Sequence, residues 1–419
     1  MRHYLIALFA ILLLATPWLA VNYSDQIKDL TIVFTDIANQ IAAVVMHNPR
    51  TIAGLQSKYN IAASQGQAKI RILLVPGHEP NYGGAEFGSI KERDLTVELA
   101  NDLQQILANN SKYQVFVTRS TTAWAPEFAD YFKNSWQNII DWVKVYQQES
   151  INLVPVNSSN GKPRVYHNKA PQNVALRLYG ITKWANDNNI DIVIHIHFND
   201  NPGHSSKLAG KYSGFTIYVP EKQYLNSTTT KAIAQTVFRR LVKYNPVSDL
   251  LGESSGITYE PDLIAIGANN TADAASMLIE YGYIYESQFN NPSVRDLALK
   301  DLAFQTYLGL QDFFDPSNTI SLANSYDTLV LPYKWKSPIS AKSSSSQDIF
   351  SLQTAFIFDG LYPPIKMNMN DCPRTGTIGA CTKASLNAFQ KKYGITGEEG
   401  VVGQKTIEKL NSVFGTRVN

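Results

Sequence analysis

From about residue 69 to residue 315, short apolar runs alternate with longer stretches in which apolar residues recur at helical spacing. The short runs predict buried strands, and the longer stretches predict amphipathic helices. The predicted strands are 71–77, 113–119, 191–199 and 276–284, and the predicted helices are 91–109, 176–190, 228–244 and 294–314. This alternation favours the α/β class, with a mixed, mostly parallel sheet that has helices on both faces.

The first 21 residues have the pattern of an export signal, because an apolar run over residues 4–21 follows Arg2. The run is close to the roughly 20 residues that a membrane-spanning helix needs, so it predicts either a signal peptide, 1–21, or a membrane anchor. Both alternatives place the protein in the cell envelope, exported from the cytoplasm. The next segment, 22–68, predicts a membrane-proximal helix over 30–45 and a polar connector over 57–67.

Beyond residue 315 the periodicity is lost, and the chain becomes rich in serine towards residue 346. Residues 316–346 therefore predict a flexible linker. The last part, 347–419, predicts a small all-α domain with an internal repeat. Gly376, Gly379, Thr382 and Leu386 recur 24 residues later as Gly400, Gly403, Thr406 and Leu410. The repeat indicates two copies of a turn and a helix, in which the threonine caps or braces the helix start.

Composition narrows the class of protein. The chain has 419 residues, 44% of them apolar, so it can bury more than one core. Its formal net charge is only +2, which gives no support for nucleic acid as a partner. The two cysteines, Cys372 and Cys381, lie close together. In an exported protein such a pair more often forms a disulfide than a metal site.

Polar side chains that could carry chemistry stand at the carboxyl ends of the predicted strands, where open α/β sheets place their sites. His78 follows the first strand, His197 lies near the end of the third, Glu280 lies inside the fourth, and Glu92 opens the helix after a glycine-rich loop. Two histidines and a glutamate form one of the ligand sets of catalytic zinc. Glu280 would then serve as a general base and acid.

Each of these residues also has a purely structural interpretation. His78 could satisfy turn amides, and Glu92 could be an ordinary first-turn carboxylate interacting with the helix dipole. His195 and His197 share one face of their strand, so only one of them need matter. Glu280 fits a structural role least well, because an unpaired carboxylate inside an apolar strand is costly to bury.

These residues resemble the motifs of a known family, the zinc-dependent N-acetylmuramoyl-L-alanine amidases often called amidase type 3. The segment VPGHEPNYGGAEFGSIKERD matches the family's Pro-Gly-His loop and the glutamate that opens the next helix, and VTR matches its L-T-R element, ending at Arg119. HIHFN matches its Ser-Ile-His-Ala-Asn motif, and EYGY matches its Glu-x-Gly-Phe motif. The resemblance covers roughly residues 70 to 315. It implies that His78, Glu92 and His197 bind Zn²⁺ and that Glu280 is catalytic.

The chain departs from the family pattern in several places. Directly after His78 the chain reads Glu-Pro-Asn-Tyr in place of the usual glycines, His195 replaces a serine, and Phe198 replaces an alanine. His195 and Glu79 are therefore additional candidates for metal or substrate contacts. The segment at about 121–168 has no counterpart in the pattern, and Trp136, Ile139, Ile140 and Val143 give it helical spacing. This insert either packs on the flank of the sheet or covers the substrate groove.

The C-terminal repeat is similar to the three-helix peptidoglycan-binding module, over about residues 347–416. Together the two resemblances imply a peptidoglycan hydrolase that cleaves the amide between N-acetylmuramic acid and L-alanine. The module would hold the enzyme on the insoluble polymer. Two other functions stay open: a zinc peptidase that cuts within the stem peptide, and a non-catalytic cell-wall-binding protein.

Overall fold

The computed structural model describes residues 47–65, 69–153, 170–201, 204–205, 207–316, 326–339 and 346–415. The predicted signal or anchor at residues 4–21 and the serine-rich stretch 340–345 lie outside these ranges. Within them, no helix combines the length and the apolar character that crossing a membrane requires.

In the described part of the chain, six strands form one sheet in the order β4-β1-β5-β8-β6-β7. All neighbouring pairs are parallel except β8 and β6. The strands are β1 Ile70–Pro76, β4 Tyr113–Val117, β5 Ile192–Asn199, β6 Thr216–Pro220, β7 Ile257–Glu260 and β8 Ala275–Tyr283. The mixed, mostly parallel sheet confirms the predicted fold class. Strands β6 and β7 were not predicted from the sequence; they are short and lie at one end of the sheet.

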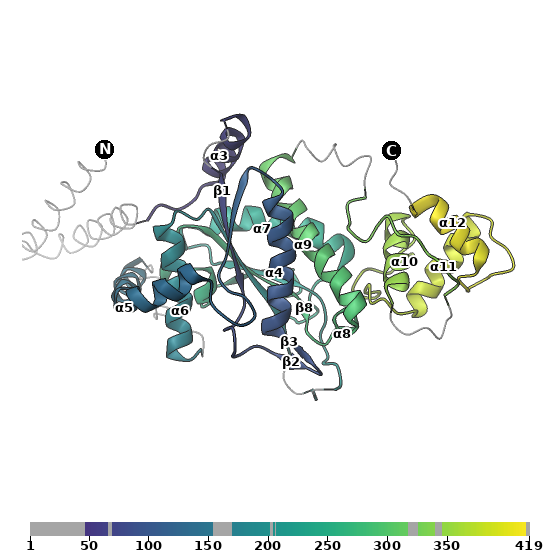
Figure 1. The fold of residues 1–419 in the computed structure, drawn as a ribbon, viewed down its shortest axis with the longest axis horizontal. Coiled ribbons are helices and arrows are strands. Elements are labelled where there is room, and N and C mark those ends of the chain that lie inside the picture. Colours follow the sequence, from purple (N-terminus) through teal and green to yellow (C-terminus); the bar gives the residue numbers. More distant parts are fainter. Residues whose placement is uncertain are drawn as a thin grey trace, which may run out of the picture.

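Helices cover both faces of the sheet (Figure 1). One face packs against α4 Glu92–Ala108, α7 Ser227–Tyr244 and α9 Pro292–Phe314. The other face packs against α5 Pro126–Leu153 and α6 Gln172–Asp187. Alternate residues of β5 separate the two cores, since Ile194 and Ile196 point to the first and Val193 to the second. Shorter elements are β2 Glu86–Phe87, β3 Ile90–Lys91, α8 Ser287–Asn290 and the 3₁₀ turns Ile264–Ile266 and Ala268–Asn270.

The stretch expected as a polar connector, 57–67, is helical through Gln65. It belongs to α3, Ile52–Gln65, whose Leu55 and Tyr59 side chains are buried. The Tyr59 ring stacks on Phe314 at the end of α9, with ring centroids 4.6 Å apart. The expectation of a connector was wrong because the stretch is polar on average, while its buried Tyr59 lies one helical turn after Leu55, which precedes the stretch.

The inserted segment forms α5, and its apolar face is buried as the flank-packing alternative expects. Phe128, Ile139 and Val143 pack in the core that α5 shares with α6 and the sheet. The main body of α5 is therefore a layer of the fold, and in the described part of the insert the first turn of α5 and the turn that precedes it can contribute to a groove.

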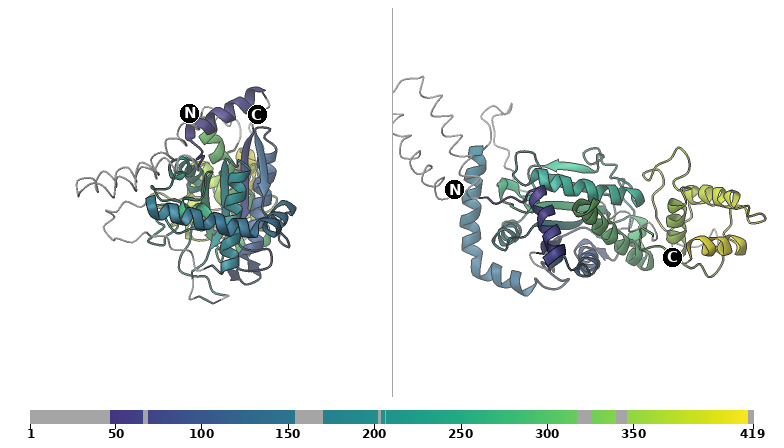
Figure 2. Two further views of the ribbon diagram at one scale, coloured as in Figure 1. Left: turned by 90° about the vertical axis from the view of Figure 1, so that its left-hand side faces the viewer. Right: turned by 90° about the horizontal axis from the view of Figure 1, so that it is seen from above.

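The C-terminal region contains the helices α10 Gln347–Phe358, α11 Ala380–Lys392 and α12 Gln404–Phe414, which stand apart from the sheet (Figure 2). Residues 326–339 pack into the core of these helices through Leu331, Trp335 and Ile339. The predicted disulfide between Cys372 and Cys381 is confirmed.

Two buried glutamines explain the sequence repeat in this region. Gln353 on α10 donates to the Thr382 hydroxyl and accepts a hydrogen bond from the Gly376 amide, both at 2.9 Å. Gln390 on α11 makes the same pair of bonds: it donates to the Thr406 hydroxyl at 3.0 Å and accepts from the Gly400 amide at 2.9 Å. Both glycines have positive φ, 73° and 71°. The repeated threonines therefore brace the helix starts through a glutamine of the preceding helix.

A buried ion pair joins the C-terminal region to the α/β domain. Arg374 Nη2 lies 2.6 Å from Oδ2 of Asp301 on α9, and both side chains are almost fully buried. The same carboxylate accepts from the Thr328 hydroxyl at 2.6 Å. The Arg374 guanidinium also lies over the Phe350 ring, 4.3 Å from its centroid. Nearby, Asn370 exchanges two hydrogen bonds with the backbone of Val247. The two parts of the chain are thus held together by specific contacts.

Replacing Arg374 with methionine should destabilise the protein by about 3–5 kcal/mol, because Asp301 would remain as an uncompensated buried charge. The double variant Asp301→Asn/Arg374→Met should recover much of this loss. Urea unfolding followed by tryptophan fluorescence measures both values. Lys392→Met, which removes an exposed ion pair with Asp359, serves as the control and should cost about 1 kcal/mol or less. If the Arg374→Met variant were as stable as this control, the buried ion pair between Arg374 and Asp301 would not have the structural role described here.

Candidate metal site

Three elements bring the predicted ligands together at the carboxyl edge of the sheet. Strand β1 ends at Pro76, and Gly77 and His78 follow it directly. The neighbouring parallel strand β5 carries His197. Glu92 is the first residue of α4, which begins immediately after the hairpin of β2 and β3. The chain between His78 and Glu92 therefore folds back over the ends of β1 and β5, so that the N-terminus of α4 lies beside them.

The three side chains converge on one point. Glu92 bridges the histidines, with Oε2 2.8 Å from His78 Nε2 and Oε1 3.0 Å from His197 Nδ1. The two imidazole rings meet edge to face, with centroids 4.9 Å apart. One ligand atom from each residue lies within 4.8 Å of the other two. This is the set predicted from the sequence, and it could hold a metal ion.

Glycines make room for this convergence. A Cβ atom on Gly77 would lie 2.3 Å from the His197 ring, and one on Gly84 would lie 2.9 Å from the His78 ring. His78 itself has a φ of 70°, a left-handed conformation that turns the chain sharply after the strand. The Pro-Gly-His sequence thus ends the strand and aims the imidazole back over its end.

The electrostatics of the site suit a cation. Burial alone would raise the pKa of Glu92, but the hydrogen bond with His197 and the close approach of His78 hold that pKa far below the usual range. The Glu92 carboxylate also accepts from the amides of Ala85 and Phe198 at 2.9 and 3.1 Å. Burial lowers the pKa of His197 and favours its neutral form. An ionised carboxylate beside neutral imidazole is the state that metal binding requires.

An orphaned atom supports the same interpretation. His78 Nε2 is buried and, among the described residues, makes no hydrogen bond of acceptable geometry, although it lies 2.8 Å from Glu92 Oε2. A lone pair this close to a carboxylate oxygen needs a proton or a cation between the two atoms. The donor set of two imidazoles and one carboxylate therefore fits a divalent metal ion such as zinc.

Glu280 lies beside this group but is not a member of it. In the parallel pairing of β5 and β8, Glu280 is the direct partner of His197. Its Oε2 atom is buried and, within the described ranges, has no hydrogen-bond partner. Burial raises the pKa of Glu280 well above its usual value, and the negative charges of Glu92 and Glu253 raise it further. Glu280 is thus positioned to hold or release a proton next to the candidate metal site.

The two additional candidates do not join the metal group. Glu79 forms an ion pair with Arg177, at 3.1 Å. His195 is buried deeper along β5, and burial, followed by the nearby His197, lowers its pKa to about 3. His195 is therefore neutral at ordinary pH.

The sequence analysis gave Arg119 no role of its own, although it ends one of the family motifs. In the structure Arg119 is buried and donates hydrogen bonds to the carbonyl oxygens of Pro76, Gly77 and Arg93. It therefore fixes the backbone that carries His78. Glu253 was also missed; it accepts a hydrogen bond from the Asn199 amide at the end of β5. Neither role follows from local sequence, because the partners are distant along the chain.

Comparisons with known proteins identify the family of this chain and several distantly similar structures. A family model described as N-acetylmuramoyl-L-alanine amidase matches residues 72–310, more than half of the chain. Among solved structures, the amidase Ami1 from Mycobacterium smegmatis is 13% identical, covers 59% of this chain and 98% of its own, and gives a TM-score of 0.39. The CwlD amidase from Clostridioides difficile, in complex with the GerS lipoprotein, is 16% identical. It covers 59% of this chain and 100% of its own, with a TM-score of 0.39. A search of curated protein sequences finds no match.

Gly77→Ala should weaken metal binding by at least about 10-fold, because the new methyl group overlaps the His197 ring and must displace it. Metal content of the purified protein and a zinc titration measure the effect. Gly252→Ala is a matched control, since a Cβ at Gly252 meets no atom within 4 Å. Full metal binding by Gly77→Ala would show that His197 is not held where the structure places it.

Proposed function

The chain belongs to the N-acetylmuramoyl-L-alanine amidase family, and from this membership we propose that it hydrolyses peptidoglycan with zinc held by His78, Glu92 and His197. The convergence of these three side chains at one edge of the sheet is the observation that supports the proposal. The scissile bond would be the amide between the lactyl group of N-acetylmuramic acid and L-alanine of the stem peptide.

Glu280 would act as the general base and then the general acid in this reaction. The chemistry that zinc supplies when bound is Lewis acidity, which polarises a carbonyl group and makes water a stronger acid. Positive charge at the neighbouring site favours the ionised form of Glu280, whose pKa is otherwise raised by burial. Ionised Glu280 accepts a proton from the attacking water and gives it to the nitrogen of the leaving amine. The products are a lactyl carboxylate and a stem peptide with a free L-alanine amino terminus.

Arg119 and Glu92 would keep this arrangement in place through hydrogen bonds. Arg119 holds the carbonyl groups of Pro76 and Gly77, which precede the proposed ligand His78. Glu92 is fixed by the amides of Ala85 and Phe198, so its carboxylate need not reorganise when the ion binds.

Glu280→Gln should lower turnover of soluble muropeptides by about 10²–10⁴-fold while bound zinc survives, because a group that moves a proton need not be a metal ligand. Mass spectrometry of digested peptidoglycan should show intact stem peptides with free L-alanine amino termini for the unmodified enzyme. The conservative change Glu98→Gln, in α4 outside the site, should leave turnover unchanged.

Each competing function gives a different result. Cleavage within the stem peptide would yield shortened peptides, and a non-catalytic wall-binding protein would release no product. If Glu280→Gln kept a near-normal rate, the role proposed for this carboxylate would be wrong.

The C-terminal helices would bind the cell wall, and the chain would act outside the cytoplasm. The paired glutamine, threonine and glycine contacts support a repeated module, of the kind whose resemblance to peptidoglycan-binding modules the sequence indicates. The disulfide between Cys372 and Cys381 agrees with an oxidising, exported environment. Residues 1–21 would direct this export.

Removing all residues after Asp315 should weaken binding to whole sacculi by about 10-fold or more while hydrolysis of soluble muropeptides persists. The truncated chain should also carry Asp301→Asn, because Arg374 is lost with the C-terminal region. Cosedimentation with sacculi in the Glu280→Gln background measures binding without digestion, and circular dichroism confirms folding. The full-length Asp301→Asn/Arg374→Met/Glu280→Gln protein is the matched control, because it leaves neither charge of the buried pair without its partner. Equal sedimentation of the two proteins would contradict a wall-binding role.

A further inference from the structure

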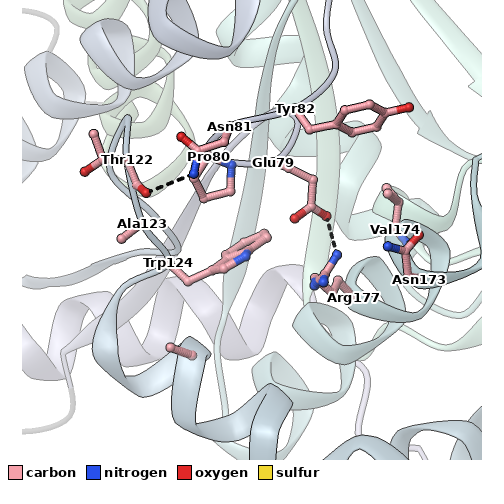
Figure 3. Close-up of a pocket in the computed structure, with 11 residues that line it drawn as sticks. Glu79, Pro80, Asn81, Tyr82, Thr122, Ala123, Trp124, Asn173, Val174 and Arg177 are labelled. Carbon is pink, nitrogen blue, oxygen red and sulfur yellow. Dashed lines mark hydrogen bonds and ion pairs between the residues drawn. The ribbon is translucent and has the colours of Figure 1, made fainter.

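A pocket of about 480 Å³ opens beside the loop that follows β1 and carries His78, here called the metal loop (Figure 3). Its volume is within the range typical of small-ligand sites. Four segments line it: the loop after His78, the turn after Arg119, the first turn of α5, and the first turns of α6. The residues that line it and enter the argument are Glu79, Pro80, Tyr82, Trp124, Val174 and Arg177.

The pocket lies next to the segment that carries the proposed ligand His78. Glu79, on its wall, is the residue next to the proposed ligand His78. Arg119 holds the backbone on both sides of this boundary, since it donates to the carbonyl groups of Gly77 and Ser120. The opposite wall comes from the turn that begins the insert, which has no counterpart in the family pattern. The pocket therefore borders the loop of His78 and is formed in part by a segment outside the family pattern.

On one side of the pocket lies the guanidinium of Arg177, which has hydrogen-bond donors that are not used within the described residues. Arg177 Nη1 lies 3.1 Å from Glu79 Oε1, in a half-buried pair. Among the described residues, Arg177 makes no other hydrogen bond, so Nε and Nη2 remain available. A guanidinium binds a carboxylate with two parallel hydrogen bonds, and partial burial strengthens them. Glu79 orients the group without saturating it.

The other side of the pocket is apolar and rigid. The Trp124 indole meets the Phe132 ring edge to face, with centroids 5.1 Å apart, and this contact fixes its orientation. Pro80 continues the apolar lining, and Val174 adds an apolar group on the α6 side, one helical turn from Arg177. Tyr82, at 62% exposure, stands at the rim. An apolar wall opposite a guanidinium suits a ligand that has both aliphatic groups and a carboxylate.

We propose that this pocket binds the stem peptide of the substrate and that Arg177 selects for a peptide carboxylate. The inference rests on the proposed function, in which the peptide is the leaving group and must extend away from the metal site. Stem peptides carry short aliphatic side chains and free carboxylates, which match the two sides of the pocket. An uncharged sugar would leave the available donors of Arg177 without an anionic partner.

The test compares two soluble muropeptides that differ only in whether the peptide carboxylates are free or converted to carboxamides. The unmodified enzyme should prefer the free acid by about 10- to 100-fold in kcat/KM, through KM, as expected for hydrogen bonds to a charged group. Arg177→Gln should abolish this preference and leave kcat and zinc content unchanged. The double variant Glu79→Gln/Arg177→Gln removes both charges, so no unpaired Glu79 disturbs the loop. Arg239→Gln, at an exposed position on α7, is the matched control.

Binding of the free stem tripeptide, measured calorimetrically in the Glu280→Gln background, separates this inference from the proposed function. If Arg177→Gln weakens tripeptide binding about 10-fold or more while no variant hydrolyses muropeptides, the pocket assignment stands and the proposed reaction fails. The pocket assignment is overturned if Arg177→Gln keeps the carboxylate preference. It is also overturned if the variant loses both substrates equally, or if its defect follows the length of the glycan rather than the charge of the peptide.

Discussion

The parallel pairing of β1, β5 and β8 is the constraint from which the candidate site arises. In this register Pro76 pairs with Ile196, and His197 pairs with Glu280, so the polar residues reach the same edge of the sheet together. The apolar residues of these strands are buried on both faces and fix the register. A shift of one residue would turn His197 to the opposite face of the sheet. Hydrophobic packing, rather than any contact between the ligands, therefore determines the geometry of the site.

The site gathers more negative charge than a buried region tolerates by itself. Glu92 is ionised and almost fully enclosed, and the pKa of neighbouring Glu280 is raised by burial and by the charge of Glu92. A divalent cation would relieve both effects, since it pairs with one carboxylate and favours ionisation of the other. Metal affinity, the protonation of Glu280 and the stability of this edge of the fold are consequently linked properties.

Local sequence was sufficient for the elements that carry the site. The strands that hold His197 and Glu280 are long apolar runs, and His78 follows a Pro-Gly pair whose backbone consequences are local. The interactions that the sequence analysis missed depend on distant partners: Arg119 with the metal loop, and Arg374 with Asp301, 73 residues away. Strands β6 and β7 were missed because they are too short to show a clear period, and α3 because its two apolar anchors lie in a polar stretch. The pocket beside Glu79 required three segments to be placed in space.

The buried contact between Arg374 and Asp301 bears on how such an enzyme would explore an insoluble polymer. A hydrolase joined to its anchor only by a loose tether can sample every bond within a sphere around the attachment point. Here the loop between α10 and α11 is also fixed to the α/β domain, through Arg374 to Asp301 on α9 and through Asn370 to the backbone of Val247. If the C-terminal helices were attached to the wall, the fold would set the distance and the angle between their attachment point and the bond that the metal site cleaves. Such a protein would sever bonds at a defined offset along the meshwork, and it would have to detach in order to reach the next one.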